Sequence, residues 1–113
     1  VQAIREHPSL KYLDLSATKL GSSNLRLLLD MQSRNKVRLE NLQCRKNKIV
    51  GIEIMDIFKK LRFNTILKVI NLQDNAIHDQ CAHEILEQYA NYNIYLEQVV
   101  LKGNKCLNTS NVE

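Results

Sequence analysis

Hydrophobic and polar positions along the chain follow one pattern that occurs four times. The clearest copy is 67–77 (LKVINLQDNAI), and the other copies are 10–20, 39–49 and 96–106. Each copy begins with apolar residues that alternate with polar ones, as Ile70 and Leu72 do. This period-two alternation predicts a short strand with one face turned inward.

After each predicted strand the apolar spacing changes to that of a helix. Ile85 and Leu86 follow Ala82 three and four positions later, and the same spacing occurs within 25–29 and 54–58. Such a triplet lies on one helical face. Leu61 and Tyr89 continue the apolar stripe in two repeats, whereas the first has Gln32 there. We expect the three helices to begin near the residues Ser22, Gly51 and Asp79, two of which are favoured N-caps.

The unit of strand plus helix recurs every 28 or 29 residues. We predict one domain, 1–113, in which 1–9 ends a preceding helix or cap, and 10–38, 39–66, 67–95 and 96–113 are three repeats and a partial fourth. Short connections between strand and helix make the strands parallel, and stacked units bury a continuous core. The predicted fold class is therefore α/β, with about 3.5 repeats.

The pattern Leu-x-x-Leu-x-Leu-x-x-Asn-x-Ile resembles a leucine-rich repeat, and the repeat length resembles the ribonuclease-inhibitor subtype. The resemblance implies a right-handed β-α solenoid with parallel strands on its concave face and helices on its convex face. This subtype is also found in tropomodulin-like actin regulators, intracellular immune receptors and axonemal subunits. The resemblance further implies that Asn47, Asn75 and Asn104 satisfy backbone groups where the chain leaves each strand. The first repeat has Thr18 at the equivalent position.

The outward residues of the four strands form the candidate protein-binding surface, which we call the concave face. They are Tyr12, Asp14, Ser16, Asn41, Gln43, Arg45, Val69, Asn71, Gln73, Gln98, Val100 and Lys102. Four strands at ~4.8 Å spacing give a patch of roughly 400 Å². A standard interface uses about 800 Å² per partner. Loops or helices must therefore join this face, or the parent array is longer.

The net charge of +4 is concentrated in the middle of the chain, where 34–62 holds nine basic residues against three acidic ones. The candidate basic patch comprises Arg34, Lys36, Arg38, Lys46, Lys48, Lys59, Lys60 and Arg62. These charges either serve solubility and the helix dipole or meet an acidic protein tail, an anionic lipid or nucleic acid. No aromatic residues are interleaved for base stacking, which argues against nucleic acid.

The sequence offers little reactive chemistry. Three cysteines cannot pair completely, and Cys44 and Cys106 stand at apolar core positions, so we expect a reducing, cytoplasmic environment. His78, Cys81 and His83 are too few for a tetrahedral metal site. No catalytic or phosphate-binding motif occurs. We therefore expect no cofactor, no metal and no enzymatic activity.

The third helix ends in a group of tyrosines. Tyr89 is expected in the core, while Tyr92 and Tyr95 are either packed or exposed as contact residues.

These patterns support a non-catalytic protein-interaction module or scaffold. The chain opens within a predicted helix and stops without a closing one, so we expect a subunit or segment of a larger intracellular assembly. No apolar run approaches the ~20 residues that a membrane span requires. The alternative function is a regulator that docks on an acidic filament or cytoskeletal surface through the basic second repeat.

Overall fold

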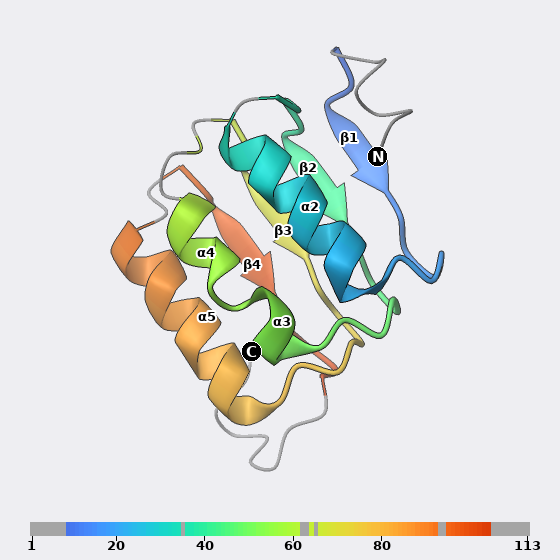
Figure 1. The fold of residues 1–113 in the computed structure, drawn as a ribbon, viewed down its shortest axis with the longest axis vertical. Helices are drawn as coiled ribbons and strands as arrows, with labels where there is room; N and C mark the ends of the chain where they lie inside the picture. The colour runs from blue at the N-terminus through green and yellow to red at the C-terminus, as the bar shows by residue number, and fades with distance from the viewer. Residues whose placement is uncertain (1–8, 35, 62–63, 65, 93–94, 105–113) are drawn as a thin grey trace.

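Four parallel strands form one sheet in the computed structural model, which describes residues 9–34, 36–61, 64, 66–92 and 95–104. The strands, in chain order and in spatial order, are β1 (Tyr12–Asp14), β2 (Asn41–Gln43), β3 (Val69–Asn71) and β4 (Gln98–Val100). Figure 1 shows this succession from β1 at one edge to β4 at the other. The predicted parallel strands are confirmed.

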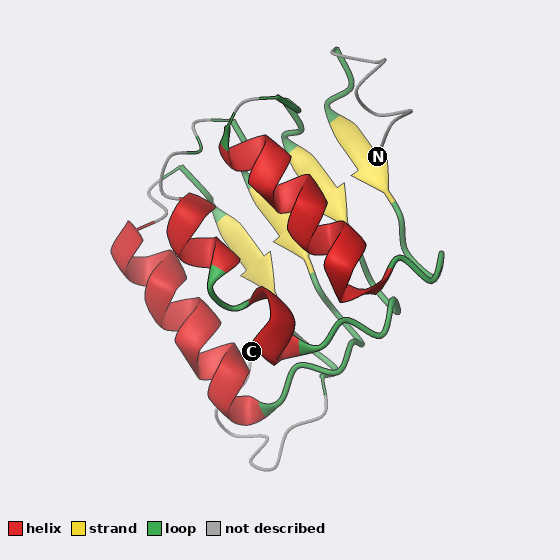
Figure 2. Cartoon of the chain, viewed as in Figure 1, coloured by secondary structure: helices red, strands yellow, loops and turns green. Residues whose placement is uncertain are grey.

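The helices all lie against one face of the sheet, as Figure 2 shows. They are α2 (Gly21–Ser33), α3 (Gly51–Ile54), α4 (Ile57–Lys60) and α5 (Asp79–Tyr92). The opposite face of the sheet carries no described helix. Sheet and helices therefore make two layers, with the core between them.

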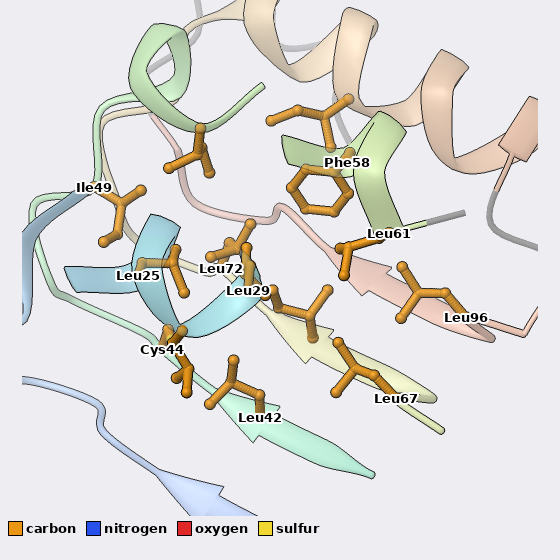
Figure 3. Close-up of a cluster of buried hydrophobic side chains, with 14 of the residues drawn as sticks. Leu25, Leu29, Leu42, Cys44, Ile49, Phe58, Leu61, Leu67, Leu72 and Leu96 are labelled. Atoms are coloured by element: carbon orange, nitrogen blue, oxygen red, sulfur yellow. The ribbon is translucent and has the colours of Figure 1, made fainter. Parts of the chain in front are cut away.

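The core consists of the apolar positions that the sequence pattern predicts. Leu25 and Leu29 of α2, Leu42 of β2 and Phe58 of α4 belong to one cluster of buried side chains between the helices and the sheet (Figure 3). All four side chains are at most 1% exposed. Burial of each such side chain contributes about 1.5–3 kcal/mol to stability. The equivalent positions of edge strand β1, such as Leu13, are only partly buried because one side of the strand has no neighbour in the sheet.

The helix of the second repeat differs from the prediction, because it is broken into α3 and α4 at Met55 and Asp56. The predicted stripe is still buried, with Ile54 and Phe58 at 0% exposure. In an unbroken helix the Glu53 carbonyl would accept a hydrogen bond from residue 57. Instead it accepts one from Arg26 Nη1, at 3.0 Å. Several β-branched residues in 51–57 also lower the helix propensity there.

Asn75 shows how the recurring asparagine joins successive repeats. Its Oδ1 accepts the backbone N–H groups of Asn47 at 2.9 Å and Ile49 at 3.0 Å, in the preceding repeat. Its Nδ2 donates to the carbonyls of Cys44 at 3.0 Å and Leu72 at 2.9 Å. The side chain is 6% exposed. One buried amide thus satisfies donors and acceptors of two repeats.

The same bonds recur on either side. Asn47 Oδ1 accepts from the N–H groups of Thr18 at 3.0 Å and Leu20 at 3.1 Å. Asn104 Oδ1 accepts from the N–H groups of Asn75 at 3.1 Å and Ile77 at 3.0 Å. We call this series the asparagine ladder (Asn47, Asn75 and Asn104). Thr18, which departs from the column, is exposed.

Two residues at the predicted helix starts have further roles between repeats. Ser22 lies inside α2, and its Oγ accepts the backbone N–H of Val50 in the next repeat at 2.8 Å, so it is not the N-cap. Gly51 begins α3 against α5, where an added Cβ would lie 2.7 Å from Cys81 Cβ and 2.9 Å from Ile77 Cγ2. Glycine is present there because the two helices approach closely.

Side chains near the C-termini of α2 and α5 attach these two helices to the segment that leads into the next strand. Gln32, the polar residue in the predicted stripe, is 1% exposed. It donates through Nε2 to the Leu39 carbonyl at 2.9 Å and accepts the Leu39 N–H through Oε1 at 3.0 Å. In the third repeat the Tyr89 hydroxyl donates to the Glu97 carbonyl at 2.7 Å while its ring packs against the core. Gln32 thus stabilises the link between helix and strand, and its buried amide group is hydrogen-bonded.

Candidate interaction surface

The strand register sorts the concave face into columns that cross the sheet. Tyr12, Asn41, Val69 and Gln98 pair in one column, and Asp14, Gln43, Asn71 and Val100 pair in the next. The inward residues Leu42 and Ile70 are buried, and the helices cover one face of the sheet (Figure 1). All twelve residues of the concave face are exposed or half-buried. The structure therefore gathers these predicted residues on the face without helices.

Three amides in the centre of the concave face are bonded to one another. Gln43 Nε2 donates to Asn41 Oδ1 at 2.8 Å, and Gln43 Oε1 accepts from Asn71 Nδ2 at 2.9 Å. Asn71 Oδ1 in turn accepts the backbone N–H of Gln73 at 2.9 Å. These bonds fix the side-chain orientations across two strands. A partner therefore meets an ordered polar surface, which lowers the entropy lost on binding.

The β1 side of the concave face carries an ionised carboxylate. Asp14 Oδ1 accepts the backbone N–H of Ser16 at 2.9 Å. Hydrogen bonds from the Ser16 side chain and backbone lower the pKa of Asp14, and the charge of Arg45 lowers it further. Tyr12 stands beside this group and is 57% exposed. This corner thus combines an aromatic ring, a carboxylate and a guanidinium group.

The structure separates the residues of the predicted basic patch. Three of them, Arg34, Lys36 and Arg38, lie between α2 and β2, on the side of the molecule where the chain passes from a helix to the next strand. Lys46 and Lys48 follow β2, at the opposite edge (Figure 1).

The other members of the patch lie on the helical side. Lys59 and Lys60 end α4, and Lys59 Nζ is 5.7 Å from the ring centroid of Tyr92. Arg62 lies outside the described residues. The eight residues therefore do not form one continuous surface.

A different basic surface, which charge counting along the sequence missed, lies where the chain leaves the strands. Lys19 joins Lys46 and Lys48 there, and we call these three residues the lysine edge. All three are exposed, and their φ angles are 61°, 55° and 55°. This left-handed conformation costs a residue with a Cβ about 1–2 kcal/mol. The predicted basic patch includes Lys46 and Lys48 but leaves out Lys19, although the alignment of the repeats places Lys19 and Lys48 in one column.

A hollow of about 300 Å³ adjoins the lysine edge. Its lining residues are Lys46, Lys48, Asp74, Asn75 and Ala76. The Asp74 carboxylate lies against Gly103, at a place where any Cβ would collide with it. The hollow thus has two ammonium groups on one repeat and one carboxylate on the next.

A second hollow, of about 380 Å³, lies on the convex face. It is lined by Ser23, Arg26, Leu27, Asp30 and Lys60. Arg26 Nη2 donates to Asp56 Oδ2 at 2.8 Å, next to this hollow. The hydrogen bond and charge of Asp56 raise the pKa of Arg26, and the same hydrogen bond lowers the pKa of Asp56. The contact connects α2 to the break between α3 and α4.

The described residues contain no group of three or more His, Cys, Asp or Glu side chains arranged to hold a metal ion. His78, Cys81 and His83 accordingly do not converge on a metal site. Cys44 and Cys81 are free thiols, and burial raises the pKa of Cys44 to about 12. Cys106 lies outside the described residues. None of the described helices is both long and apolar enough to cross a bilayer.

The remaining tyrosines of the third repeat are exposed, Tyr92 by 38% and Tyr95 by 51%. They are open to contact at the end of α5 and ahead of β4.

Comparison with known proteins identifies the fold. No family model matches the chain, and no curated protein matches it. Among solved structures, the chain is similar to the tropomodulin C-terminal domain of Caenorhabditis elegans, with a TM-score of 0.64 and 15% sequence identity. The match covers 92% of this chain and 60% of that one. The chain therefore has a leucine-rich-repeat solenoid fold, and it spans less than two thirds of the length of that domain.

Proposed function

We propose that this chain is a non-catalytic protein-interaction module that works within a larger assembly. One observation carries the proposal: a face of an all-parallel sheet is free of described helices. Parallel sheets are usually covered on both faces. A bare face with ordered polar side chains is what a leucine-rich-repeat solenoid offers to a partner.

The chemistry of the concave face suits a protein partner. Half-buried Val69 and Val100 lie among the bonded amides, and exposed Tyr12 stands at the β1 edge. Aromatic residues and preorganised polar groups are typical of protein interfaces. The strand face alone provides about half of a standard interface, so the adjoining loops take part or further repeats extend it.

We further propose the ribonuclease-inhibitor subtype and an intracellular site. The 13-residue α2 and the 14-residue α5 support the subtype, because both are full helices rather than short turns. Free Cys44 and Cys81 support a reducing compartment. The similarity to the tropomodulin domain supports association with the cytoskeleton.

Site-specific photocrosslinking tests the use of the concave face. A photoreactive amino acid replaces Asn71 on the concave face or, as the matched control, Ile52, which is 67% exposed on the helical side. Cells of the source organism that express each variant are irradiated and the adducts are compared. We expect a defined protein adduct from position 71 alone. Equal adducts from both positions, or none from position 71, contradict this use of the concave face.

The second candidate function is docking on an acidic filament through the second repeat. The observation in its favour is that Lys46 and Lys48 are exposed and pair with no carboxylate of the described residues. Cosedimentation with actin filaments, which serve as an acidic test filament, checks it at low and high salt. Charge reversal of Arg45, Lys46 and Lys48 should abolish both the binding and its salt dependence. Unchanged binding leaves the concave face as the sole candidate.

A further inference from the structure

We propose that the lysine edge is the docking site for an acidic protein segment, whose carboxylates bind Lys19, Lys46 and Lys48 together. The inference rests on the second candidate function and narrows it. It selects two residues from the predicted basic patch, adds Lys19 from another repeat, and leaves the other members out. Four observations on the structure lead to it.

The first observation is the fixed placement of the loops. Asn47 Oδ1 holds the N–H groups of both Thr18 and Leu20, so the loop that carries Lys19 lies beside the loop that carries Lys48. The Lys46 N–H donates to the Gln73 carbonyl at 3.1 Å and holds that loop against the third repeat. The three ammonium groups are therefore presented by a rigid scaffold. Binding to such a scaffold loses little backbone entropy.

The second observation is that no described acid pairs with these lysines. Lys11 pairs with Glu40, Arg26 with Asp56 and Arg34 with Asp30, and none of these described ion pairs includes a residue of the lysine edge. Like charges gathered on one edge repel one another and attract anions. Partner carboxylates would remove this repulsion. Arg34 differs, since Asp30 at 2.6 Å already partners it.

The third observation is the backbone conformation. Lys46 occupies the position that Gly103 has in the fourth repeat, and both have positive φ. Glycine adopts this conformation without strain, whereas lysine does not. All three residues of the lysine edge share the left-handed conformation. Ala17 and Asp74 share this conformation, so it belongs to the turns of the repeats and gives the three lysines the same local backbone placement.

The fourth observation is the hollow of about 300 Å³ beside Lys46 and Lys48. Its volume accepts a side chain, and its lining holds two lysines against one aspartate, Asp74, so the net positive charge suits a carboxylate. The exposed tyrosines of the described chain, Tyr12, Tyr92 and Tyr95, belong to β1 or flank α5 and β4. The lysine edge thus lacks the aromatic platforms that single-stranded nucleic acid uses. These features favour an acidic protein over nucleic acid.

Fluorescence anisotropy of a labelled poly-glutamate peptide tests the proposal on the whole 113-residue chain. The test variant reverses the lysine edge (Lys19→Glu, Lys46→Glu and Lys48→Glu). The matched control reverses three basic residues of the opposite edge (Arg34→Glu, Lys36→Glu and Arg38→Glu). We expect roughly tenfold weaker binding for the test variant, as three exposed ion pairs would give. The control should bind within about twofold of the unmodified chain, apart from the general effect of net charge.

A second variant distinguishes a loss of binding from a loss of folding. Lys46→Gly with Lys48→Gly removes two charges and also the backbone strain, so the fold is retained, as circular dichroism would show. Its peptide binding should still fall several-fold. Undiminished binding would overturn the proposal.

The remaining outcomes separate the inference from the function on which it rests. If the opposite-edge control loses as much affinity as the test variant, the lysine edge is not the site, although acidic docking itself stands. If the unmodified chain does not bind the peptide at low salt, both the inference and the second candidate function fail. If a single-stranded oligouridylate binds more tightly than the peptide at equal salt, the assignment to an acidic protein is wrong.

Discussion

Asn75 accepts the backbone N–H of Asn47 through its Oδ1 at 2.9 Å, and thereby joins the turn of the third repeat to that of the second. The same oxygen accepts the N–H of Ile49 at 3.0 Å. Both donors are buried, so they lose their hydrogen-bond acceptor if the amide oxygen is removed. The asparagine ladder is therefore a structural requirement of the stack, distinct from its binding surfaces.

Asn75→Ala should lower the free energy of unfolding by about 3–5 kcal/mol, since it leaves several buried backbone groups unpaired. Urea denaturation followed by circular dichroism measures this change. Thr18→Ala is the matched control, because the Thr18 hydroxyl is exposed and bonds mainly to the Leu15 carbonyl at 2.6 Å. Its effect should stay below ~1 kcal/mol. Similar losses in the two variants would contradict the ladder as described.

Gly51→Ala should destabilise the chain by about 1–3 kcal/mol through overpacking against Cys81 and Ile77. Gly21→Ala is a useful comparison, because an added Cβ meets nothing within 4 Å but the φ of +76° is strained for alanine. That variant tests conformation without crowding. Adding Cys81→Gly should recover part of the loss at Gly51 and none of the loss at Gly21. Thermal unfolding of the four variants checks this pattern.

The contact between Arg26 and Asp56 should make stability depend on acid pH. The hydrogen bond from Arg26 lowers the pKa of Asp56 in the folded chain. The resulting stabilisation is present above the unfolded pKa of about 3.9 and is lost as the pH falls through the lower, folded value. Both side chains are substantially exposed, so screening limits the effect to under ~1 kcal/mol.

Asp56→Asn should remove this pH dependence, which urea denaturation at pH values between neutral and strongly acidic measures. Glu53→Gln is the control, because Arg26 contacts the Glu53 carbonyl and not its carboxylate. An equal change of the acid dependence in both variants would show that the cause is general charge.

Lys46→Gly should leave stability unchanged or raise it by up to ~1 kcal/mol, because glycine relieves the positive φ of 55°. Lys60→Gly removes the same side chain from α4 and should cost about 1 kcal/mol instead. The opposite signs distinguish strained lysine from helical lysine. Equal losses would show that the Lys46 conformation carries no strain.

Cys44 should resist thiol modification near neutral pH, since burial raises its pKa to about 12 and keeps it protonated. Cys81 is half-buried and should react faster. Labelling with a thiol-specific reagent, read by peptide mass spectrometry, compares the two sites in the folded chain. Unfolding in urea should make the two rates similar, and equal rates before unfolding would contradict the burial of Cys44.

The sequence predicts those features that arise from periodicity. Ile70 and Leu72 share a strand face, and the spacing of Leu25 and Leu29 places both on one helical face, so strands, helices and core follow from the pattern. The break at Met55 and Asp56 was not predicted, and it lies where Arg26 of another repeat contacts the Glu53 carbonyl and the Asp56 carboxylate.

The candidate site was partly predictable for the same reason. The concave face follows from strand alternation, and its columns agree with the observed register. The lysine edge depends on positive φ angles and on loops that are hydrogen-bonded across repeats. Neither of these properties is encoded in a hydrophobic period. Ser22 was misassigned as an N-cap because its acceptor role toward Val50 is also formed between repeats.

The asparagine ladder has one further consequence, because each amide oxygen serves the repeat that precedes it. If the first repeat detaches, the turn of the second retains its acceptor, Asn75. If the strand end that carries Asn104 detaches, the N–H groups of Asn75 and Ile77 lose theirs. The side-chain hydrogen bonds that the ladder forms between repeats therefore all run in one direction, from each repeat to the repeat before it. We expect it to fray from the β1 end, and hydrogen exchange should run fastest there and slow toward the third repeat.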